Sequence, residues 1–282
     1  MAQTAVVCNG LEGIVVAETQ NSEVDGQRGK LVIRGRDAED LAFESTFEET
    51  CALLWAGPQQ VASLRPSLKK EFGEARLQAF QLIKENPALL SQKHPMDALR
   101  TATSFLTGGT ENDPASFAKI AAAVGVFAAN WSRVHSGLSL MQPDKDLSHS
   151  ADILRIARDA SPSQAETRAL DIYLTTVSDH GMNASTFTAR VVASTASDNI
   201  SCIVAAIGAL KGPLHGGAPG PVLEMLNAIG TAENAEEWLS AELDSGRRIM
   251  GMGHRIYKVR DPRAAIFEKA IKELEMAGLP AT

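Results

Sequence analysis

The stretch from residue 183 to residue 211, NASTFTARVVASTASDNISCIVAAIGALK, predicts two consecutive helices made largely of small and apolar residues. Asp198 interrupts the run, and its side chain is suited to cap the second helix at its N-terminus. Because alanine, serine and glycine fill most of the second helix, other backbones can approach it closely. We expect this helix to be central or to pack against a partner subunit. Its apolar residues form one stripe at helical spacing: Ile200, Ile203, Val204, Ile207 and Leu210.

Helical patterns also account for most of the chain before residue 183. They cover residues 47–55, followed by Gly57 and Pro58, and then 68–86, 97–106, 117–131, 147–160 and 166–178. Residues 117–131 are apolar almost all round, so we expect that helix to be buried on most sides. Strand patterns occur only near the start, where GIVVAET (13–19) and KLVIRG (30–35) flank a polar stretch. The sequence predicts an all-α fold with a short N-terminal β-hairpin.

The chain of 282 residues, 44% of them hydrophobic, is long enough for one large domain or two ordinary ones. Its longest apolar run, residues 120–129, has ten residues, whereas a helix needs ~20 to cross a bilayer. We therefore expect no membrane partner. The start, MAQTAVVCNG, lacks the pattern of a secretory signal, which favours a cytoplasmic protein. The net charge of −7 argues against a nucleic-acid partner.

The cysteines and histidines do not indicate a metal site. Cys8, Cys51 and Cys202 lie far apart without a CxxC arrangement, which favours reduced thiols over disulfides or a cysteine-ligated zinc. No pair of histidines has the HxxxH spacing of a helical metal site. We expect no metal and no bound cofactor.

Three histidines lie beside glycines or at helix ends: His180 in DHGMN, His215 in GPLHGG and His254 in GMGHRIYK. His180 could simply cap the end of its helix. Glycines next to His215 and His254 let a ligand approach the backbone. The glycine- and proline-rich stretch 212–221 is the one plausible domain boundary, and it is a hinge, a binding loop or both. The remaining histidines favour structural or exposed roles: His94, His135 and His149.

Basic residues gather near the C-terminal end: Arg247, Arg248, Arg255, Lys258, Arg260 and Arg263. They either form a solvated face that balances the acidic helix before them, or they bind an anion. Asp261 and Pro262 are typical of an N-cap and first helical position, which puts Arg263 where the helix dipole disfavours a cation. A bound anion between Arg263 and the free backbone amides would explain this, and a small dicarboxylate has a suitable size.

These residues together suit proton transfer at a carbonyl group. Neutral histidines polarise carbonyl oxygens, and arginines hold carboxylates through paired hydrogen bonds. An obvious carboxylate base is missing. Asp179 is next to His180 in sequence, but adjacent helical residues point in different directions.

Several motifs in this order resemble the citrate synthase family. They are RGRDAEDLA (34–42), FEETCALLWAG (47–57), DHGMNASTFTAR (179–190), GPLHGGAPGPVLEML (212–226) and GMGHRIYKVRDPRA (251–264). The resemblance implies an all-α homodimer that condenses acetyl-CoA with oxaloacetate. It also implies a large dimerising domain, residues 1–214, and a smaller domain that closes over the substrates, of which residues 215–282 are a part.

The same resemblance implies roles for individual residues. His215 matches the catalytic histidine that stabilises the enol of acetyl-CoA, and His254 matches the one that polarises the oxaloacetate carbonyl. His180 and Arg263 match further oxaloacetate ligands. Positions that match the CoA site are Ile249, Gly251, Gly253 and Lys258.

Two alternatives to this interpretation stay open at this point. In the family, the catalytic aspartate and later arginines follow further along the chain, so we expect residues 1–282 to lack them and to have little activity. One alternative is 2-methylcitrate synthase, which uses propionyl-CoA. The other is a non-catalytic homologue that binds the ligands and serves as a regulatory module.

Overall fold

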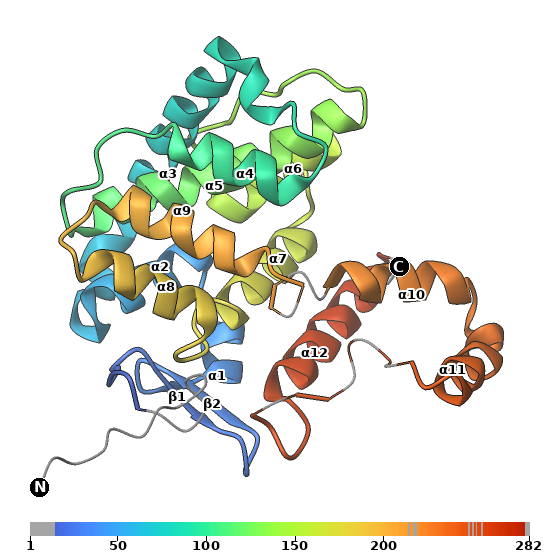
Figure 1. Cartoon of the computed structure of the whole chain (residues 1–282). Coiled ribbons are helices and arrows are strands. Elements are labelled where there is room, and N and C mark those ends of the chain that lie inside the picture. The colour runs from blue at the N-terminus through green and yellow to red at the C-terminus, as the bar shows by residue number, and fades with distance from the viewer. Residues whose placement is uncertain are drawn as a thin grey trace, which may run out of the picture.

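The computed structural model describes residues 15–213, 215–216, 219–247, 249, 251, 253–254 and 256–279, and it is mainly helical, as predicted (Figure 1). The helices of the first half are α1 (Ala38–Glu44), α2 (Phe47–Ala56), α3 (Val61–Glu85), α4 (Pro95–Ser104), α5 (Pro114–His135) and α6 (His149–Arg158). Those of the second half are α7 (Gln164–Thr176), α8 (Ala184–Ala193), α9 (Asn199–Leu210), α10 (Pro219–Ile229), α11 (Ala235–Asp244) and α12 (Pro262–Met276). The strands are β1 (Ser22–Asp25), β2 (Lys30–Ile33) and β3 (Arg36–Asp37). No helix in this described part is both long and apolar enough to cross a membrane.

The helical segments predicted from the sequence are confirmed, although their ends differ. The Asp198 side chain caps α9 as predicted, because its carboxylate accepts a hydrogen bond from the Ser201 N–H at 2.8 Å. Gly57 ends α2 with a φ of 85°. The start of α3 at Val61 is earlier than predicted, because Pro66 lies within the helix and does not end it.

The hairpin is confirmed, but its first strand lies later than predicted. Residues 15–19 form no strand, and β1 follows them. The reason is the turn between β1 and β2. The Asp25 carboxylate accepts hydrogen bonds from the backbone N–H groups of Gln27 and Arg28, both at 3.0 Å. The chain therefore reverses directly after β1, and β2 pairs with the nearest residues rather than with the more apolar stretch before them.

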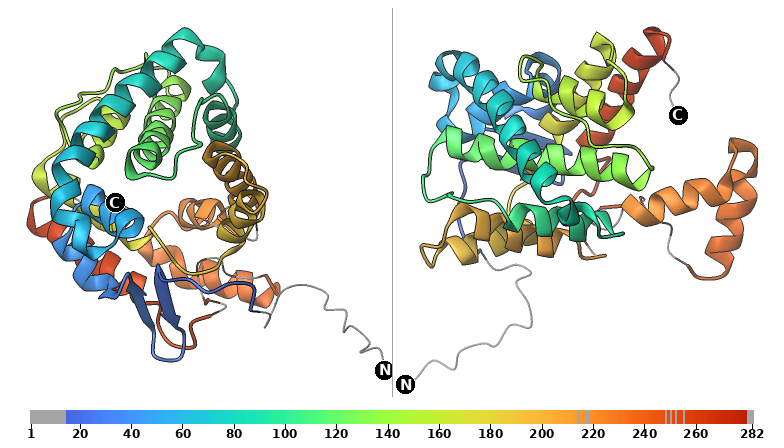
Figure 2. Two further views of the ribbon diagram at one scale, coloured as in Figure 1. Left: turned by 90° about the vertical axis from the view of Figure 1, so that its left-hand side faces the viewer. Right: turned by 90° about the horizontal axis from the view of Figure 1, so that it is seen from above.

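Helix α5 lies in the middle of the helical body, next to α3, α4 and α6 (Figure 2). Its residues Ala122, Ala123, Val126 and Phe127 are almost fully buried. The alanines allow α3 to approach closely. The prediction that this helix is buried on most sides is confirmed.

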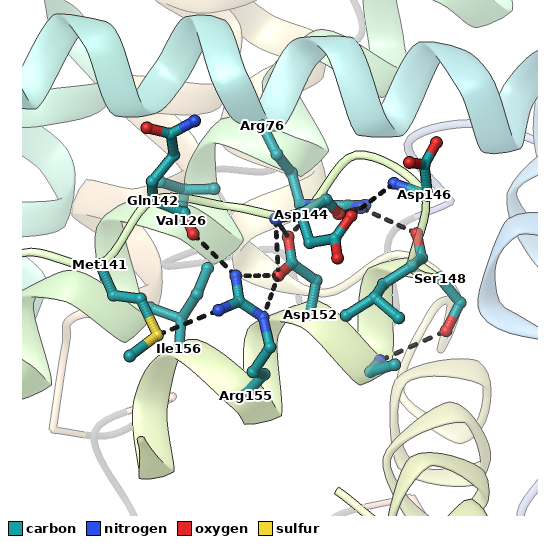
Figure 3. Close-up of polar contacts among 12 residues, drawn as sticks. Arg76, Val126, Met141, Gln142, Asp144, Asp146, Ser148, Asp152, Arg155 and Ile156 are labelled. Carbon is teal, nitrogen blue, oxygen red and sulfur yellow. Dashed lines mark hydrogen bonds and ion pairs between the residues drawn. The ribbon is translucent and has the colours of Figure 1, made fainter. Parts of the chain in front are cut away.

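A buried ion pair joins α3 to α6. Arg76 Nε lies 2.7 Å from Asp152 Oδ2, and both side chains are fully buried. Arg76 Nη2 also donates to the carbonyl oxygens of Asp144 and Leu147, both at 2.9 Å. Asp152 accepts further hydrogen bonds from the Asp144 N–H and from Arg155 (Figure 3). Because buried charges need partners and hydrogen bonds, this network fixes the segment between α5 and α6 against both helices.

His149, at the start of α6, is a buried histidine in an aromatic group. Its ring centroid lies 5.1 Å from that of Phe72 and 5.2 Å from that of Phe47. Its Nδ1 has no hydrogen-bond partner among the described residues. Burial, and then the charge of Arg76, lower the pKa of His149 from 6.5 to about 3. The ring is therefore neutral at physiological pH, and its predicted structural role is confirmed.

A second core connects the hairpin to the C-terminal helix. Leu31 and Ile33 of β2 pack with Ile172 of α7 and Ile266 of α12. Helix α12 thus lies on the body formed by the earlier part of the chain, whereas α10 and α11 extend away from it (Figures 1 and 2). The domain boundary after residue 214 stays a prediction.

We expect the folding stability to fall below pH 6.5, because the unfolded chain then protonates His149 and the folded chain does not. Since the pKa is lower in the folded state, this contribution is fully present above pH 6.5. It falls by about 1.4 kcal/mol per pH unit as the pH decreases toward 3. Urea unfolding between pH 7 and pH 5 measures this slope.

His149→Phe should reduce the slope by about that amount, because it removes the titrating group. His94→Gln is the matched control, since His94 is an exposed histidine. An equal pH slope in the wild type and in His149→Phe would contradict the prediction.

Candidate active site

Three aromatic side chains meet beside the hairpin. His180 follows α7, whereas His254 and Tyr257 precede α12. The ring centroid of His180 lies 5.5 Å from that of His254, and the ring of Tyr257 lies 4.9 Å from that of His254. A hydrogen bond of 2.9 Å joins His180 Nε2 to the Tyr257 hydroxyl. Tyr257 is buried and His254 is exposed, so the group is closed on the tyrosine side and open on the His254 side.

Arg263 lies next to this group in the first turn of α12, as predicted. Asp261 caps the helix by accepting a hydrogen bond from the Arg263 N–H at 3.0 Å. The same carboxylate holds the guanidinium group, with Nη2 and Oδ2 2.6 Å apart. The predicted anion is therefore not needed to explain this cation, because Asp261 supplies the negative charge. Arg263 Nη2 also lies 3.5 Å from His254 Nε2.

Both histidines of the group favour the neutral form. Burial, and then the positive charge of Arg263, lower the pKa of His180 from 6.5 to about 4. The same two causes lower the pKa of His254. Burial acts to raise the pKa of Asp261, but the hydrogen bonds and charge of Arg263 outweigh it and hold that pKa below its usual value. At neutral pH the group thus contains an ion pair and two uncharged imidazoles.

Backbone contacts indicate the tautomer of His254. Its Nδ1 accepts hydrogen bonds from the backbone N–H groups of Ile256 at 3.2 Å and Tyr257 at 3.4 Å. A neutral imidazole that accepts at Nδ1 carries its proton on Nε2. The Nε2–H of His254 and Nη2 of Arg263 are then two donors 3.5 Å apart. This arrangement suits a ligand oxygen that accepts from both, such as a carbonyl or carboxylate oxygen.

His215 lies in a different set of contacts. Its Nε2 is 2.6 Å from the Ser185 hydroxyl in the first turn of α8, and its backbone N–H donates to the Gly212 carbonyl at 2.9 Å. The next residue, Gly216, packs closely against α9. A Cβ at this position would lie 2.4 Å from Leu210 Cδ1, so the absence of a side chain allows the contact. None of the contacts in the described residues joins His215 directly to His180 or His254.

Asp179, the only nearby carboxylate that the sequence suggested as a base, is directed toward the hairpin. It accepts a hydrogen bond from the Ser22 hydroxyl and another, at 3.1 Å, from the Gly181 N–H. Both contacts hold the backbone on either side of His180. The position of Asp179 therefore favours a structural role.

The positions expected to bind CoA are spread along the segment before α12. Gly251 has a φ of 84° and lies against Val222 of α10, and Gly253, with a φ of 82°, precedes His254. Ile249 is half-buried. Lys258 has an exposed side chain, and its backbone N–H donates to Gly26.

Sequence reasoning missed three residues of this region: Tyr257, Ser185 and Ser22. The sequence did contain an indication for Tyr257, because it is an aromatic residue inside the motif GMGHRIYK. Ser185 and Ser22 had none, since a serine in a helix or strand pattern is ordinary. Only the fold brings them next to His215 and Asp179.

Comparisons with known proteins agree on one family. The family profile described as "Citrate synthase, C-terminal domain" matches residues 10–280. A citrate synthase from Deinococcus radiodurans is 37% identical over 268 residues, which are 92% of this chain and 71% of that protein. A 2-methylcitrate synthase from Mycobacterium tuberculosis is 36% identical and covers 94% of this chain and 69% of its own length.

A solved structure is also similar. It is a ternary complex of carboxymethyl coenzyme A and oxaloacetate with citrate synthase from Thermoplasma acidophilum. The TM-score is 0.78 at 27% identity, and the match covers 97% of this chain and 74% of that one.

We expect Arg263→Gln to raise the pKa of both His180 and His254. The substitution removes the positive charge that lowers both values, and it leaves Asp261 unpaired, which favours the protonated rings further. NMR titration of the histidine ring protons measures both values. Arg260→Gln is the matched control, because Arg260 pairs with exposed Glu268 and does not act on either ring. Unchanged histidine titrations in Arg263→Gln would contradict the electrostatics described here.

Proposed function

The chain belongs to the citrate synthase family of acyltransferases, which condense acetyl-CoA with oxaloacetate, and we propose that His180, His254 and Arg263 hold the oxaloacetate. The observation that carries this proposal is the pair of donors 3.5 Å apart, the neutral His254 ring and the Arg263 guanidinium. Oxaloacetate has a ketone between two carboxylates, so it offers acceptor oxygens of both kinds.

Each residue has a chemical task in this proposal. His254 donates its Nε2–H to the ketone oxygen, which makes the ketone carbon a better electrophile. Arg263 pairs with a carboxylate, and Asp261 keeps the guanidinium group in place before the substrate arrives. Neutral His180 is held by Tyr257 at Nε2, so its contact with the oxaloacetate falls to Nδ1. A depressed histidine pKa supports these tasks, because the rings act as uncharged donors over the physiological pH range.

We propose that His215 stabilises the enol of acetyl-CoA. Its Nε2 is engaged by Ser185, so the contact with the thioester oxygen falls to Nδ1. The hydrogen bond also holds His215 against the start of α8, close in sequence to His180. Closure of the segment that carries α10 would bring acetyl-CoA against oxaloacetate.

The CoA site is proposed at Ile249, Gly251, Gly253 and Lys258. Gly251 and Gly253 both have a positive φ, and the backbone N–H groups at such glycines can donate hydrogen bonds to an adenine or to a phosphate oxygen. The exposed Lys258 side chain supplies a positive charge for a CoA phosphate.

The identity of the transferred acyl group is a separate question, because 2-methylcitrate synthases are as similar to this chain as several citrate synthases. We propose acetyl-CoA as the substrate and propionyl-CoA as the alternative. A binding homologue without turnover is the remaining alternative, and a turnover assay with both thioesters separates the three. The proposed reaction is cytoplasmic and needs neither a metal nor a bound cofactor.

A homodimer is proposed from the helix pair α8 and α9. None of the residues of α8 is buried by the described part of the chain, and Val191 is 50% exposed. A helix pair this rich in small and apolar residues suits a partner helix at close range. Residues 1–214 would then form the dimerising domain, and residues 215–282 would belong to the smaller one, whose α12 packs back on α7.

We expect Arg263→Gln to weaken oxaloacetate binding by roughly 10- to 150-fold, since a lost hydrogen bond to a charged group costs about 1.5–3 kcal/mol. Isothermal calorimetry on the wild type and the variant measures this. Arg260→Gln should bind as the wild type does. Equal affinity in wild type and Arg263→Gln would show that other residues hold the dicarboxylate.

His215→Ala should separate binding from turnover. It should keep the oxaloacetate affinity, because His215 makes no described contact with the His180 group, and it should remove most of the small CoA release that residues 1–282 are expected to give with acetyl-CoA. Thiol release followed with a chromogenic disulfide is the assay. Loss of oxaloacetate binding in His215→Ala, or unchanged CoA release, would contradict the role proposed for His215.

We expect a dimer at micromolar concentration, and Val191→Asp should convert it into a monomer by placing a charge in the proposed interface. Multi-angle light scattering gives the mass of each form. Leu243→Asp on α11 is the control, because it changes an apolar residue that is also exposed and lies outside the α8 and α9 pair. A monomeric wild type would contradict the proposal.

A further inference from the structure

The hairpin of β1 and β2 contacts both segments that carry the site histidines. We propose that this hairpin is a positioning element of the oxaloacetate site, in which Ser22 sets the place of His180 and Gly26 sets the place of His254. The inference rests on the proposed function only for the identity of the ligand. The contacts themselves are independent of it.

At one end of the hairpin, Ser22 holds the backbone around His180. The Ser22 hydroxyl donates to Asp179 and accepts from the Gly181 N–H at 2.8 Å. These two residues lie directly before and after His180. Val24 of the same strand lies 3.7 Å from the position that a Cβ of Gly181 would occupy. The segment between α7 and α8 is therefore held at both neighbours of the histidine by a single side chain.

At the other end, the hairpin turn holds the segment after His254. The Gly26 carbonyl accepts a hydrogen bond from the Lys258 N–H at 2.8 Å. A Cβ on Gly26 would lie only 2.3 Å from the Ile256 carbonyl oxygen, so no other residue fits without displacing that backbone. Because the Ile256 N–H donates to His254 Nδ1, a shift of this backbone also changes the ring that polarises the substrate.

The hairpin is rigid enough to act as a spacer between these two contacts. Its strands are paired from Ser22 to Asp25, and the Arg34 N–H closes the open end by donating to the Asn21 carbonyl at 2.7 Å. Leu31 and Ile33 on the paired strand are buried in the core with α7 and α12. The same two helices border the histidine segments. One small sheet thus fixes the separation of two loops that are distant in sequence and have no regular structure of their own.

The test uses Ser22→Ala, Ser22→Thr and Gly26→Ala in the full chain, with Glu23→Ala as the control. Glu23 is on the same strand, and its side chain is exposed. Calorimetry gives the oxaloacetate affinity, thermal unfolding reports the fold, and NMR of the unliganded protein follows the ring signals of the two histidines. Thr keeps the hydroxyl, so Ser22→Thr should behave as the wild type does.

We expect Ser22→Ala and Gly26→Ala each to weaken oxaloacetate binding at least about fivefold, a change of about 1 kcal/mol. Ser22→Ala should shift mainly the His180 signals, and Gly26→Ala mainly those of His254. A purely structural hairpin would lower the unfolding temperature but leave the affinity and the histidine signals of the folded protein unchanged, and that result would overturn the inference. So would an equal effect of Glu23→Ala.

Failure of the proposed function gives a different result. If the wild type does not bind oxaloacetate but the variants still shift the predicted histidine signals, the positioning role stands and the ligand is wrong. If Gly26→Ala does not fold, the comparison of Ser22→Ala with Ser22→Thr decides the inference alone. Unchanged His180 signals in a folded Ser22→Ala protein would then overturn it.

Discussion

The buried pair of Arg76 and Asp152 is the contact on which the rest of the helical body depends. Both side chains are fully buried, and loss of one partner would leave an uncompensated charge, at a typical cost of about 3–5 kcal/mol. The net gain from such a pair is small, because desolvation offsets the attraction. The pair instead selects one arrangement of the two helices, since only one placement of α6 against α3 pairs both charges. That placement also buries His149 beside Arg76 and keeps it neutral.

Helix α7 connects α6 to the site, because it contacts α6 and leads to His180. Ser150 donates to Asp171 at 2.6 Å, and the Phe47 N–H donates to the same carboxylate at 3.2 Å. These contacts hold α7 against α2 and α6. His180 follows the end of α7, and α12, which carries Arg263, packs on the same helix. The two sides of the proposed oxaloacetate site therefore share one support, and the hairpin adds a second.

The electrostatics of the site follow from this packing. Burial and the fixed charge of Arg263 lower the pKa of His180 and of His254, and Asp261 balances the arginine without neutralising its effect on the rings. A histidine without these neighbours would be partly protonated near its usual pKa of about 6.5. Here the imidazoles stay neutral donors, which suits the polarisation of a carbonyl oxygen. A proton relay would need a pKa nearer to neutral pH.

The sequence by itself determined the helices, the second strand of the hairpin and the cap at Asp198, because these depend on periodicity and on side chains within a few residues of the backbone they serve. It also identified the family and placed His180 and His254 as candidates. Only the tertiary structure decided what surrounds them. The Tyr257 hydroxyl lies 2.9 Å from His180 Nε2, and Ser22 engages Asp179, which sequence proximity had suggested as a base. These are contacts between segments far apart in the chain, and no local pattern records which loops the fold brings together.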